Sequence, residues 1–507
     1  MKSFLKKCHK WIGLIFTFFI IMFCLSGIIL NHRKTFSGLE ISRNVLPKDY
    51  RYDNWNNGLL RGSIKTADDA VLYYGNAGIW KTDSCFSASK EYNEGLKKGV
   101  ANRKIANMAV MPDGSVWCAG LYDIYRLDGE EWLPQEALHA EGERLTDLTS
   151  RGDTLVVISR SEVFQSLPPY SEFTRYQLKD ADKSVRKVSL FRTMWLIHSG
   201  EMFGLPGQLF VDLVAIVITI LCITGLIYVF VPKIMKKRKA KKKSVKTQSR
   251  FLKYGVKWHN KLGSWTIVFT VLLAFTGMCL RPPLMIPFVM GSTNPIPGSI
   301  LDSDNPWVDK LRCAKWDNHL QRWILHSSSG FFTLTDWESV PQRMKGTPPV
   351  SPMGINVFAQ DSLGADSWIV GSFSGIFRWN PETGEVLDYL TGEKATPHRG
   401  MPVGGYAVAG YTDDWKDGAC IFGHGGGARP VKENAVFSEM PEEMKGLPMS
   451  LWNFALEVHV GRMYTLLNFI SPVYVFLSGL FLILTLLTGY IIYKRRKKKK
   501  KPETVKK

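Results

Sequence analysis

Four long apolar stretches, each with a histidine at or shortly before its start, constrain this chain more than any other feature. These are Trp11–Leu30 after His9, Gln208–Val231 after His198, Leu262–Leu280 after His259, and Phe469–Tyr493 after His459. Each has about 20 residues or slightly more, enough to cross a hydrocarbon core of roughly 30 Å. A histidine at the mouth of a membrane helix is costly unless it is used. The pattern predicts four transmembrane helices that ligate haem and carry electrons across a membrane.

The formal net charge of +20 is concentrated in short segments. Pro232–Lys257, between the second and third stretches, holds 12 Lys or Arg and no acidic residue, and the tail Lys494–Lys507 is also strongly basic. Because short basic segments stay cytoplasmic, we expect both termini on the cytoplasmic side and two large segments on the outer side of the membrane. Stop-transfer charge and contact with anionic lipid explain the basic runs, so no nucleic-acid partner is expected.

These arguments divide the chain into nine segments. They are a cytoplasmic N-terminus (1–10), transmembrane helix 1 (11–31), an extracytoplasmic β-rich segment (32–207), transmembrane helix 2 (208–231), a basic cytoplasmic linker (232–258), transmembrane helix 3 (259–281), a second extracytoplasmic β-rich segment (282–468), transmembrane helix 4 (469–493) and a basic cytoplasmic tail (494–507). The first stretch is followed by no A-x-A-like cleavage site, so we expect it to remain as an anchor.

The two halves of the chain repeat. His9-Lys10-Trp11-Ile12-Gly13 matches His259-Asn260-Lys261-Leu262-Gly263, and His198-Ser199-Gly200 resembles His459-Val460-Gly461. A Ser/Thr-Gly pair lies late in every helix: Ser26-Gly27, Thr224-Gly225, Thr276-Gly277 and Thr488-Gly489. Close helix packing explains the glycines of these pairs. Gly13 and Gly263, one turn from a histidine, either pack against a helix or make room for a flat ring. The repeats run in parallel, with one helix pair in each half.

This set of motifs resembles the PepSY-associated transmembrane (PepSY_TM) family. The shared pattern is H-K-W-x-G, an apolar run ending in Ser/Thr-Gly, Asn31-His32, and a later H-S/T-G before a helix that ends in Thr-Gly. The family comprises iron-regulated inner-membrane proteins, some of them siderophore-iron reductases with b-type haem. The resemblance covers the four helices and implicates five haem-iron ligands: His9, His32, His198, His259 and His459. The chain departs from the pattern at Pro282, which stands where a second Asn-His would put a counterpart of His32, and at Val460.

Equivalent positions in the two repeats predict which histidines share a haem. His9 and His259 are expected together on the cytoplasmic side, and His198 and His459 on the outer side, because axial ligation needs neutral imidazoles from facing helices. His32 lies 23 residues after His9, about 34 Å along a helix. It is expected at the outer face, where it either replaces one member of the outer pair or serves another haem. Two haems divide the distance across the bilayer better than one, although the number stays open.

The two outer segments contain short alternating runs separated by turn residues, which is typical of β-structure. Six blade-like units are expected near residues 68–84, 104–132, 143–176, 313–338, 352–390 and 404–438. One shared six-bladed propeller and two separate β or α+β modules both fit this pattern. Histidines in these segments are expected to be surface or turn residues. Four cysteines lie outside the membrane, where disulfides form, and the sequence does not decide their pairing: Cys85, Cys118, Cys313 and Cys420.

The cytoplasmic segments are too short for a nucleotide-binding domain, so no NAD or flavin module is expected in the chain. Electrons would come from quinol or from a separate cytoplasmic donor. The leading hypothesis is a haem b protein that reduces extracytoplasmic ferric iron, siderophore-bound or otherwise chelated, together with outer-membrane iron-uptake proteins. The alternative is a non-enzymatic receptor or uptake component with a β-rich sensor domain. The sequence does not identify a catalytic residue for the ferric substrate.

Overall fold

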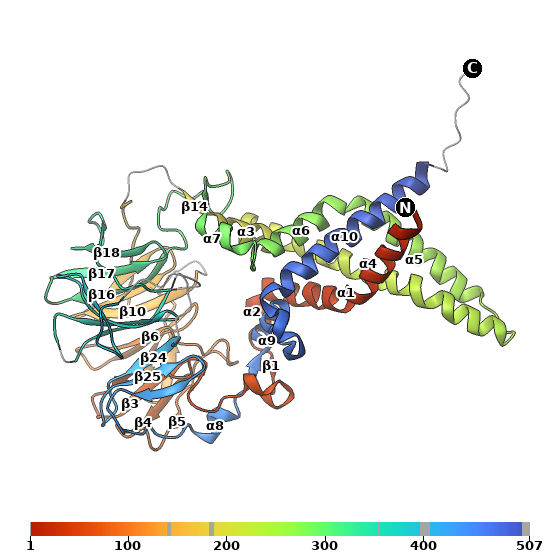
Figure 1. The fold of residues 1–507 in the computed structure, drawn as a ribbon. Helices are drawn as coiled ribbons and strands as arrows, with labels where there is room; N and C mark the ends of the chain where they lie inside the picture. The colour runs from red at the N-terminus through yellow and green to blue at the C-terminus, as the bar shows by residue number, and fades with distance from the viewer. Residues whose placement is uncertain are drawn as a thin grey trace. The chain divides into compact units, whose positions relative to one another are not determined.

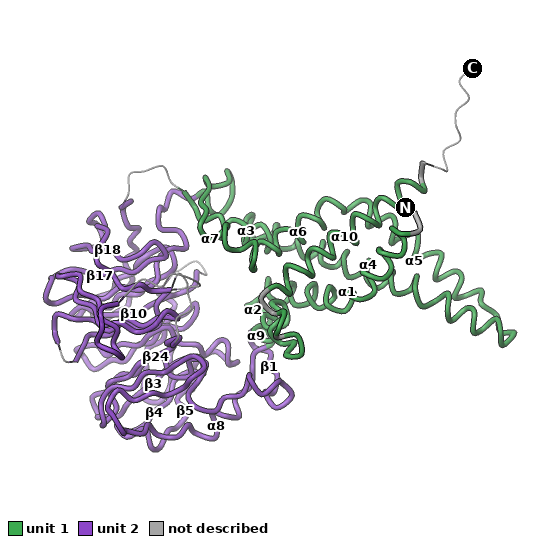
Figure 2. The backbone as a smooth tube through the Cα atoms, viewed as in Figure 1, with its two compact units in different colours: residues 1–36, 185–302, 451–507 green, residues 37–184, 303–450 purple. Residues whose placement is uncertain are grey.

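The computed structural model describes residues 2–138, 143–181, 187–351, 354–362, 364–395 and 406–498. The chain divides into two compact units (Figure 2). The helical unit comprises residues 1–36, 185–302 and 451–507, and the sheet unit comprises residues 37–184 and 303–450. Each unit is therefore assembled from segments of both halves of the chain.

The helical unit contains the long helices and several short ones (Figure 1). They are α1 (Lys2–Asn31), α2 (Arg33–Phe36), α3 (Leu190–Ser199), α4 (Gly204–Ala240), α5 (Lys246–Trp265), α6 (Ile267–Cys279), α7 (Met285–Met290), α9 (Leu451–His459) and α10 (Ser471–Lys498), with 3-10 turns η3 (Glu201–Phe203) and η4 (Thr465–Ile470). Strands β14 (Val188–Ser189) and β15 (Ser292–Thr293) pair within this unit. Helix α1 packs against α4, α9 and α10, while α4 packs against α5, and α6 against α3 and α10.

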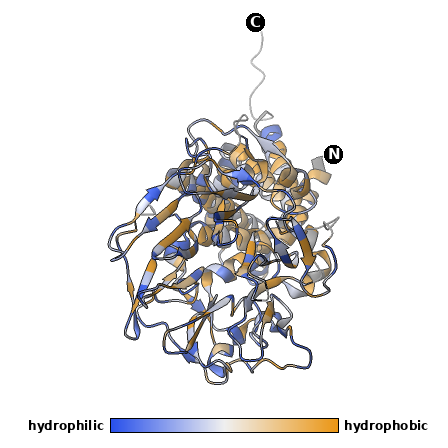
Figure 3. Cartoon of the chain, turned by 90° about the vertical axis from the view of Figure 1, so that its left-hand side faces the viewer, coloured by the Kyte–Doolittle hydropathy of each residue, from blue (hydrophilic) through white to orange (hydrophobic). Residues whose placement is uncertain are grey.

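Within the part of the chain that the structure describes, three stretches of helix are long and apolar enough to cross a membrane: Phe4–Asn31, Glu201–Ala240 and Val473–Arg496. Much of the helical unit is hydrophobic (Figure 3). Helices α5 and α6 pass the same test together, but the chain bends by 69° between them. The chain is thus a membrane protein with three candidate spans, or four if the bent pair is one span.

Two expected boundaries differ from the structure. The third stretch, expected as one helix over 259–281, is broken between Trp265 and Ile267. Gly263-Ser264 directly precedes the break, and the Thr266 hydroxyl donates to the Leu262 carbonyl at 2.9 Å. Such residues weaken a helix locally. The expected linker 232–258 is largely helical, since α4 continues to Ala240 and α5 begins at Lys246. Lysine and arginine are good helix formers, and α4 continues the second apolar stretch without a break.

The sheet unit contains six antiparallel sheets whose strands follow in chain order. They are β2 (Gly62–Lys65), β3 (Val71–Gly75), β4 (Gly78–Thr82), β5 (Lys90–Glu91); β6 (Asn107–Val110), β7 (Val116–Ala119), β8 (Ile124–Asp128), β9 (Glu131–Pro134); β10 (Leu145–Arg151), β11 (Thr154–Ser159), β12 (Val163–Ser166), β13 (Thr174–Tyr176); β16 (Leu311–Asp317), β17 (Arg322–Ser327), β18 (Gly330–Leu334), β19 (Gln342–Arg343); β20 (Ile355–Gln360), β21 (Trp368–Ser372), β22 (Gly375–Asn380), β23 (Glu385–Asp388); and β24 (Val408–Thr412), β25 (Cys420–Gly423), β26 (Gly427–Pro430).

The remaining elements of the sheet unit are short. They are β1 (Glu40–Ile41), which pairs with β27 (Met449–Ser450), the 3-10 turns η1 (Arg43–Val45) and η2 (Lys48–Tyr50), and helix α8 (Glu442–Lys445). The β-rich character expected for the outer segments is confirmed. Each of the six expected blade-like ranges corresponds to one sheet.

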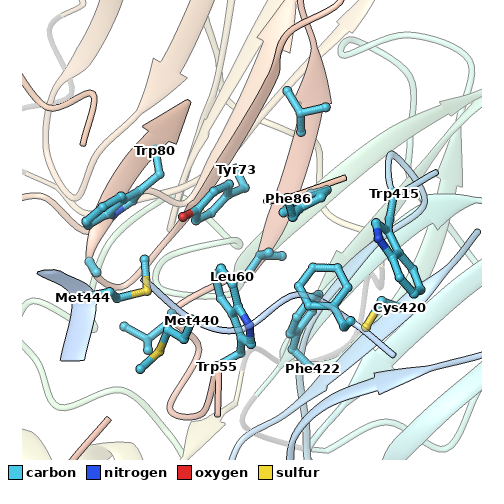
Figure 4. Packing of buried hydrophobic residues seen from close by; sticks show 14 of the residues in the cluster. Trp55, Leu60, Tyr73, Trp80, Phe86, Trp415, Cys420, Phe422, Met440 and Met444 are labelled. Carbon is cyan, nitrogen blue, oxygen red and sulfur yellow. The ribbon is translucent and has the colours of Figure 1, made fainter. Parts of the chain in front are cut away.

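Hydrophobic cores lie between successive sheets, so a sheet with a neighbour on each side has apolar residues buried on both faces. One further core joins the sixth sheet to the first (Figure 4). There Phe422 from β25 lies in the same cluster as Tyr73 from β3 and Trp55. All eight cysteines are free, including the four outside the helices, so the sheets are held by packing without disulfides.

Candidate functional site

Both predicted histidine pairs are brought together in the helical unit. In the first pair, His9 of α1 faces His259 of α5, with ring centroids 6.1 Å apart and planes at 76°. Two other helices hold the rings through Nδ1. The Nδ1 atom of His9 lies 2.9 Å from the Thr485 carbonyl oxygen on α10. That of His259 lies 3.2 Å from the Leu221 carbonyl oxygen on α4.

The second pair repeats this arrangement with different helices. His198, at the end of α3, faces His459, at the end of α9, again with ring centroids 6.1 Å apart and with planes at 57°. The Nδ1 atom of His198 lies 3.2 Å from the Leu273 carbonyl oxygen on α6. That of His459 lies 3.0 Å from the Ser26 hydroxyl on α1. Each histidine is therefore positioned by a helix other than its own.

These hydrogen bonds fix the tautomer. A carbonyl oxygen only accepts, so the proton of a neutral ring is on Nδ1 in His9, His198 and His259. The Ser26 hydroxyl already donates to the Met22 carbonyl at 2.6 Å, so it accepts from His459. Thr224 and Thr276 likewise donate along their own helices and lie 2.9 and 3.1 Å from Nδ1 of His259 and His198. The lone pair of Nε2 is then the one that can bind a metal.

The glycines of the Ser/Thr-Gly pairs make room for these rings. A methyl group added at Gly489 would lie 2.8 Å from Cε1 of His9, and one at Gly277 would lie 2.9 Å from Cε1 of His198. A methyl group added at Gly27 would lie 3.4 Å from Cε1 of His459, and one at Gly225 would lie 3.8 Å from Cε1 of His259. The expectation of plain helix–helix packing was incomplete, since these glycines pack against histidine.

Gly13 and Gly263 have the other role. Their nearest neighbours would be Thr485 Cγ2 and Leu221 Cδ2, each at 3.5 Å, so they bring helices together. Packing against a helix is thus observed for both glycines, and room for a flat ring stays a prediction.

The H-x-G motifs place the second pair at helix ends. Gly200 and Gly461 have φ of 79° and 83°, a conformation that glycine adopts without strain. Gly200 caps α3 directly after His198 and Ser199. After each of these glycines the chain continues into a long helix, α4 or α10. This explains why glycine follows each of these histidines by two residues.

The two pairs lie at different levels along α1. Ser26, which contacts the second pair, follows His9 of the first pair by 17 residues. Since α1 is a continuous helix, this spacing corresponds to about 25 Å. The separation approaches the roughly 30 Å thickness of a bilayer core.

His32 is not part of either pair. Its Nε2 lies 2.6 Å from Oδ2 of Asp212 on α4. Asn31 donates to the other oxygen of Asp212 at 3.0 Å and to the Ser199 carbonyl at 3.1 Å. The Asn31-His32 motif thus binds a buried carboxylate and the end of α3.

The sequence reasoning missed Asp212 and the hydroxyl groups of the Ser/Thr-Gly pairs. Asp212 is 7% exposed within an otherwise apolar stretch, and an acidic residue in that setting was the available signal. Among the described residues, no group of three or more His, Cys, Asp or Glu side chains is suited to hold a metal ion. The two histidine pairs are therefore the candidate centres.

The family model of the PepSY-associated TM region matches residues 227–496. The chain belongs to this family. The match begins within α4 and includes α5, α6, α9 and most of α10. The matched residues therefore contain His259, His459 and two of the four Ser/Thr-Gly pairs. Thr224-Gly225, His9, His32 and His198 precede the match.

Solved structures show only distant likeness. The extracellular domain of the BT4673 system of B. thetaiotaomicron, described as one-component, has 10% identity and a TM-score of 0.37, covering 80% of this chain and 44% of its own. The BT4673 domain described as hybrid two-component has 9% identity and a TM-score of 0.33, with 76% and 40% covered. That of BT3049 has 10% identity and a TM-score of 0.32, with 74% and 39% covered. The chain thus spans less than half of each. No curated protein matches.

Proposed function

We propose that this protein holds two haem b groups, one at each histidine pair, and passes electrons across the membrane to reduce ferric iron outside. The observation that carries the proposal is the repeated pair geometry. The four imidazoles would hold the two groups through Nε2, His9 with His259 and His198 with His459. Both pairs have a centroid distance of 6.1 Å.

The environment of the rings supports the same assignment. In each neutral ring Nδ1–H donates to a carbonyl or hydroxyl oxygen, which leaves Nε2 for iron and keeps the ring orientation fixed. Glycine beside Cε1 lets the rings of His9 and His198 lie close to the adjacent helix. When bound, haem b supplies one-electron exchange between ferric and ferrous iron. The residues of the chain supply ligands, orientation and exclusion of water.

Transmembrane electron transfer is supported by the separation of the pairs. The two pairs lie about 25 Å apart along α1, so electron transfer across the bilayer would occur in an inner and an outer step. His9 and His259 are the pair nearer to the basic N-terminus and to the basic segment between α4 and α5. By the charge argument this side is cytoplasmic, so electrons would enter at the first pair and leave at the second. In this proposal the first pair is on the cytoplasmic side and the second pair is at the periplasmic face of an inner membrane.

We also propose that α5 and α6 form one bent span, which makes four spans, and that the six sheets close into a propeller. The bent pair passes the length and hydropathy test as a unit. A core between the sixth sheet and the first, in addition to cores between successive sheets, favours closure. The resemblance to siderophore-iron reductases favours a chelated ferric substrate, for which the sheet unit would provide the binding surface.

The experiment is ferric reduction by the protein in sealed vesicles. A reductant is supplied inside, a ferric hydroxamate chelate outside, and ferrous iron is measured with a chromogenic chelator. His259→Ala is expected to abolish this reduction, while the outer haem remains reducible by dithionite, because its ligands lie at the other level. Undiminished ferric reduction in a folded His259→Ala protein would show that the first pair is not on the electron path.

A further inference from the structure

Helices α4 and α5 form a strongly basic hairpin beyond the apolar stretches. Pro232–Lys257 has 12 Lys or Arg and no acidic residue. Most of these side chains are exposed: Lys233, Lys236, Lys237, Lys239, Lys241, Lys242, Lys243, Lys246, Arg250, Lys253 and Lys257. The two helices pack along one another, and Gly255 allows α5 to approach Ile227 of α4. The charges are therefore displayed on an ordered helical surface, which we call the basic hairpin (residues 232–258).

The basic hairpin is longer than a stop-transfer signal requires. Helix α4 continues from the end of the apolar stretch at Val231 to Ala240, which adds about 14 Å of helix. The headgroup layer on one side of a bilayer is only about 5–8 Å thick. In the proposed orientation, the charges near the turn between α4 and α5 extend past the headgroups into the cytoplasm. Contact with anionic lipid explains the charges near the membrane but not those at the tip.

Aromatic side chains on α5 connect this surface with the first pair. Phe251 and Tyr254 are 54% and 62% exposed, although both are large apolar residues. The Tyr254 ring lies 6.1 Å from that of Trp258, which directly precedes His259. The spacing of the three residues puts them on one side of the helix. Aromatic residues are enriched in the centres of protein interfaces.

We infer that the basic hairpin is the docking surface for a small acidic electron-carrier protein, with Phe251 and Tyr254 as its apolar contacts. The inference rests on the proposed function, because it names the donor that delivers electrons to the first pair. In each encounter the carrier's cofactor would lose one electron, and the ferric haem that His9 and His259 would hold would gain it and become ferrous. Complementary charge accelerates such encounters and orients them. A membrane quinol would approach through the lipid and would gain nothing from charges in the cytoplasm.

The test measures binding directly. The full-length protein is placed in nanodiscs of phosphatidylcholine, and the dissociation constant of an acidic flavodoxin is measured as a function of salt. A quadruple variant, with Lys236, Lys239, Lys243 and Lys246 changed to Gln, is expected to bind at least about tenfold more weakly and with a smaller salt dependence. The matched control changes Lys48, Lys65, Lys98 and Lys187 of the outer segments to Gln and is expected to bind as the unchanged protein does.

A second variant separates contact from charge. Tyr254→Ala is expected to weaken flavodoxin binding severalfold while leaving the salt dependence unchanged. Reduction by flavodoxin, followed by stopped-flow absorbance, should slow in the order of the dissociation constants. Binding that is unaltered in the quadruple variant overturns the inference, as does flavodoxin binding only after phosphatidylglycerol is added. A haem-free protein would overturn the proposed function, whereas the binding measurement would still decide the inference.

Discussion

At the scale of single residues, the space beside each histidine should decide whether haem binds. Gly277→Ala and Gly489→Ala would place a methyl group 2.9 and 2.8 Å from Cε1 of His198 and His9. Contacts this short force the ring or the helix to shift. Each variant is expected to lose one haem of two, because a ligand displaced by a few tenths of an ångström no longer meets the iron. Haem content per chain, measured as the pyridine haemochrome, checks this.

Gly225→Ala is the matched control. It lies in the same motif, but its added methyl group would be 3.8 Å from His259, an ordinary contact. This variant should keep both haems. Loss of haem from Gly225→Ala, with retention in Gly489→Ala, would contradict the assigned role of these glycines.

His326 in the sheet unit should make stability depend on pH. The ring is 3% exposed in β17, its Nδ1 has no hydrogen-bond partner among the described residues, and burial lowers its pKa from 6.5 to about 3. At a pH between these two pKa values, His326 binds a proton in the unfolded chain but not in the folded chain. Stability is therefore complete above about pH 6.5 and falls as the pH decreases, by about 1.4 kcal/mol per unit.

Thermal unfolding followed by tryptophan fluorescence between pH 5 and 7 measures this slope. His326→Phe is expected to flatten this slope, because phenylalanine does not titrate and can replace the imidazole, whose centroid lies 4.6 Å from that of Phe331. His319→Gln, at an exposed histidine bonded to Glu382, should keep the slope. An unchanged slope in His326→Phe would show that another group is responsible. The sequence did not distinguish these two residues, because burial depends on neighbouring strands, and His326 was wrongly expected at the surface.

At the scale of elements, the Asn31-His32 motif should be structural and not a haem ligand. His32 binds Asp212, and Asn31 connects α1 with both α4 and the end of α3. His32→Ala is expected to lower the melting temperature and to retain both haems. His198→Ala and His459→Ala should each remove one. Absorption spectra of the three purified variants test this, and a haem lost from His32→Ala but not from His459→Ala would reverse the assignment.

The pairing of the histidines followed from the repeat, because duplicated motifs place equivalent residues at equivalent depths. His9 with His259 and His198 with His459 are the pairs that the structure brings together. The partners of Nδ1 did not follow, since Thr485, Thr224, Thr276 and Ser26 lie on other helices. The helix break at Thr266 was also not predicted, because an apolar run indicates the length of a helix but not whether the helix bends. The six sheets were readable from alternating strands and turns, whereas the cores between them depend on contacts distant in sequence.

At the scale of the whole molecule, the distribution of charge predicts the topology. Reporter fusions after Lys243 should report the cytoplasm, and fusions near Asp361 in the sheet unit should report the periplasm. Alkaline phosphatase and a cytoplasm-active fluorescent protein at both positions provide complementary signals. A cytoplasmic signal at Asp361 would overturn the proposed direction of electron flow.

The central claim is that each histidine pair holds one haem, and it is tested most directly by haem stoichiometry and spectrum. Protein purified from haem-replete cells, oxidised and then reduced with dithionite, should contain two haem b per chain with the spectrum of six-coordinate iron. His9→Ala or His259→Ala should remove one haem, and His198→Ala or His459→Ala the other. Haem-free protein, or four variants that all retain two haems, would contradict the account.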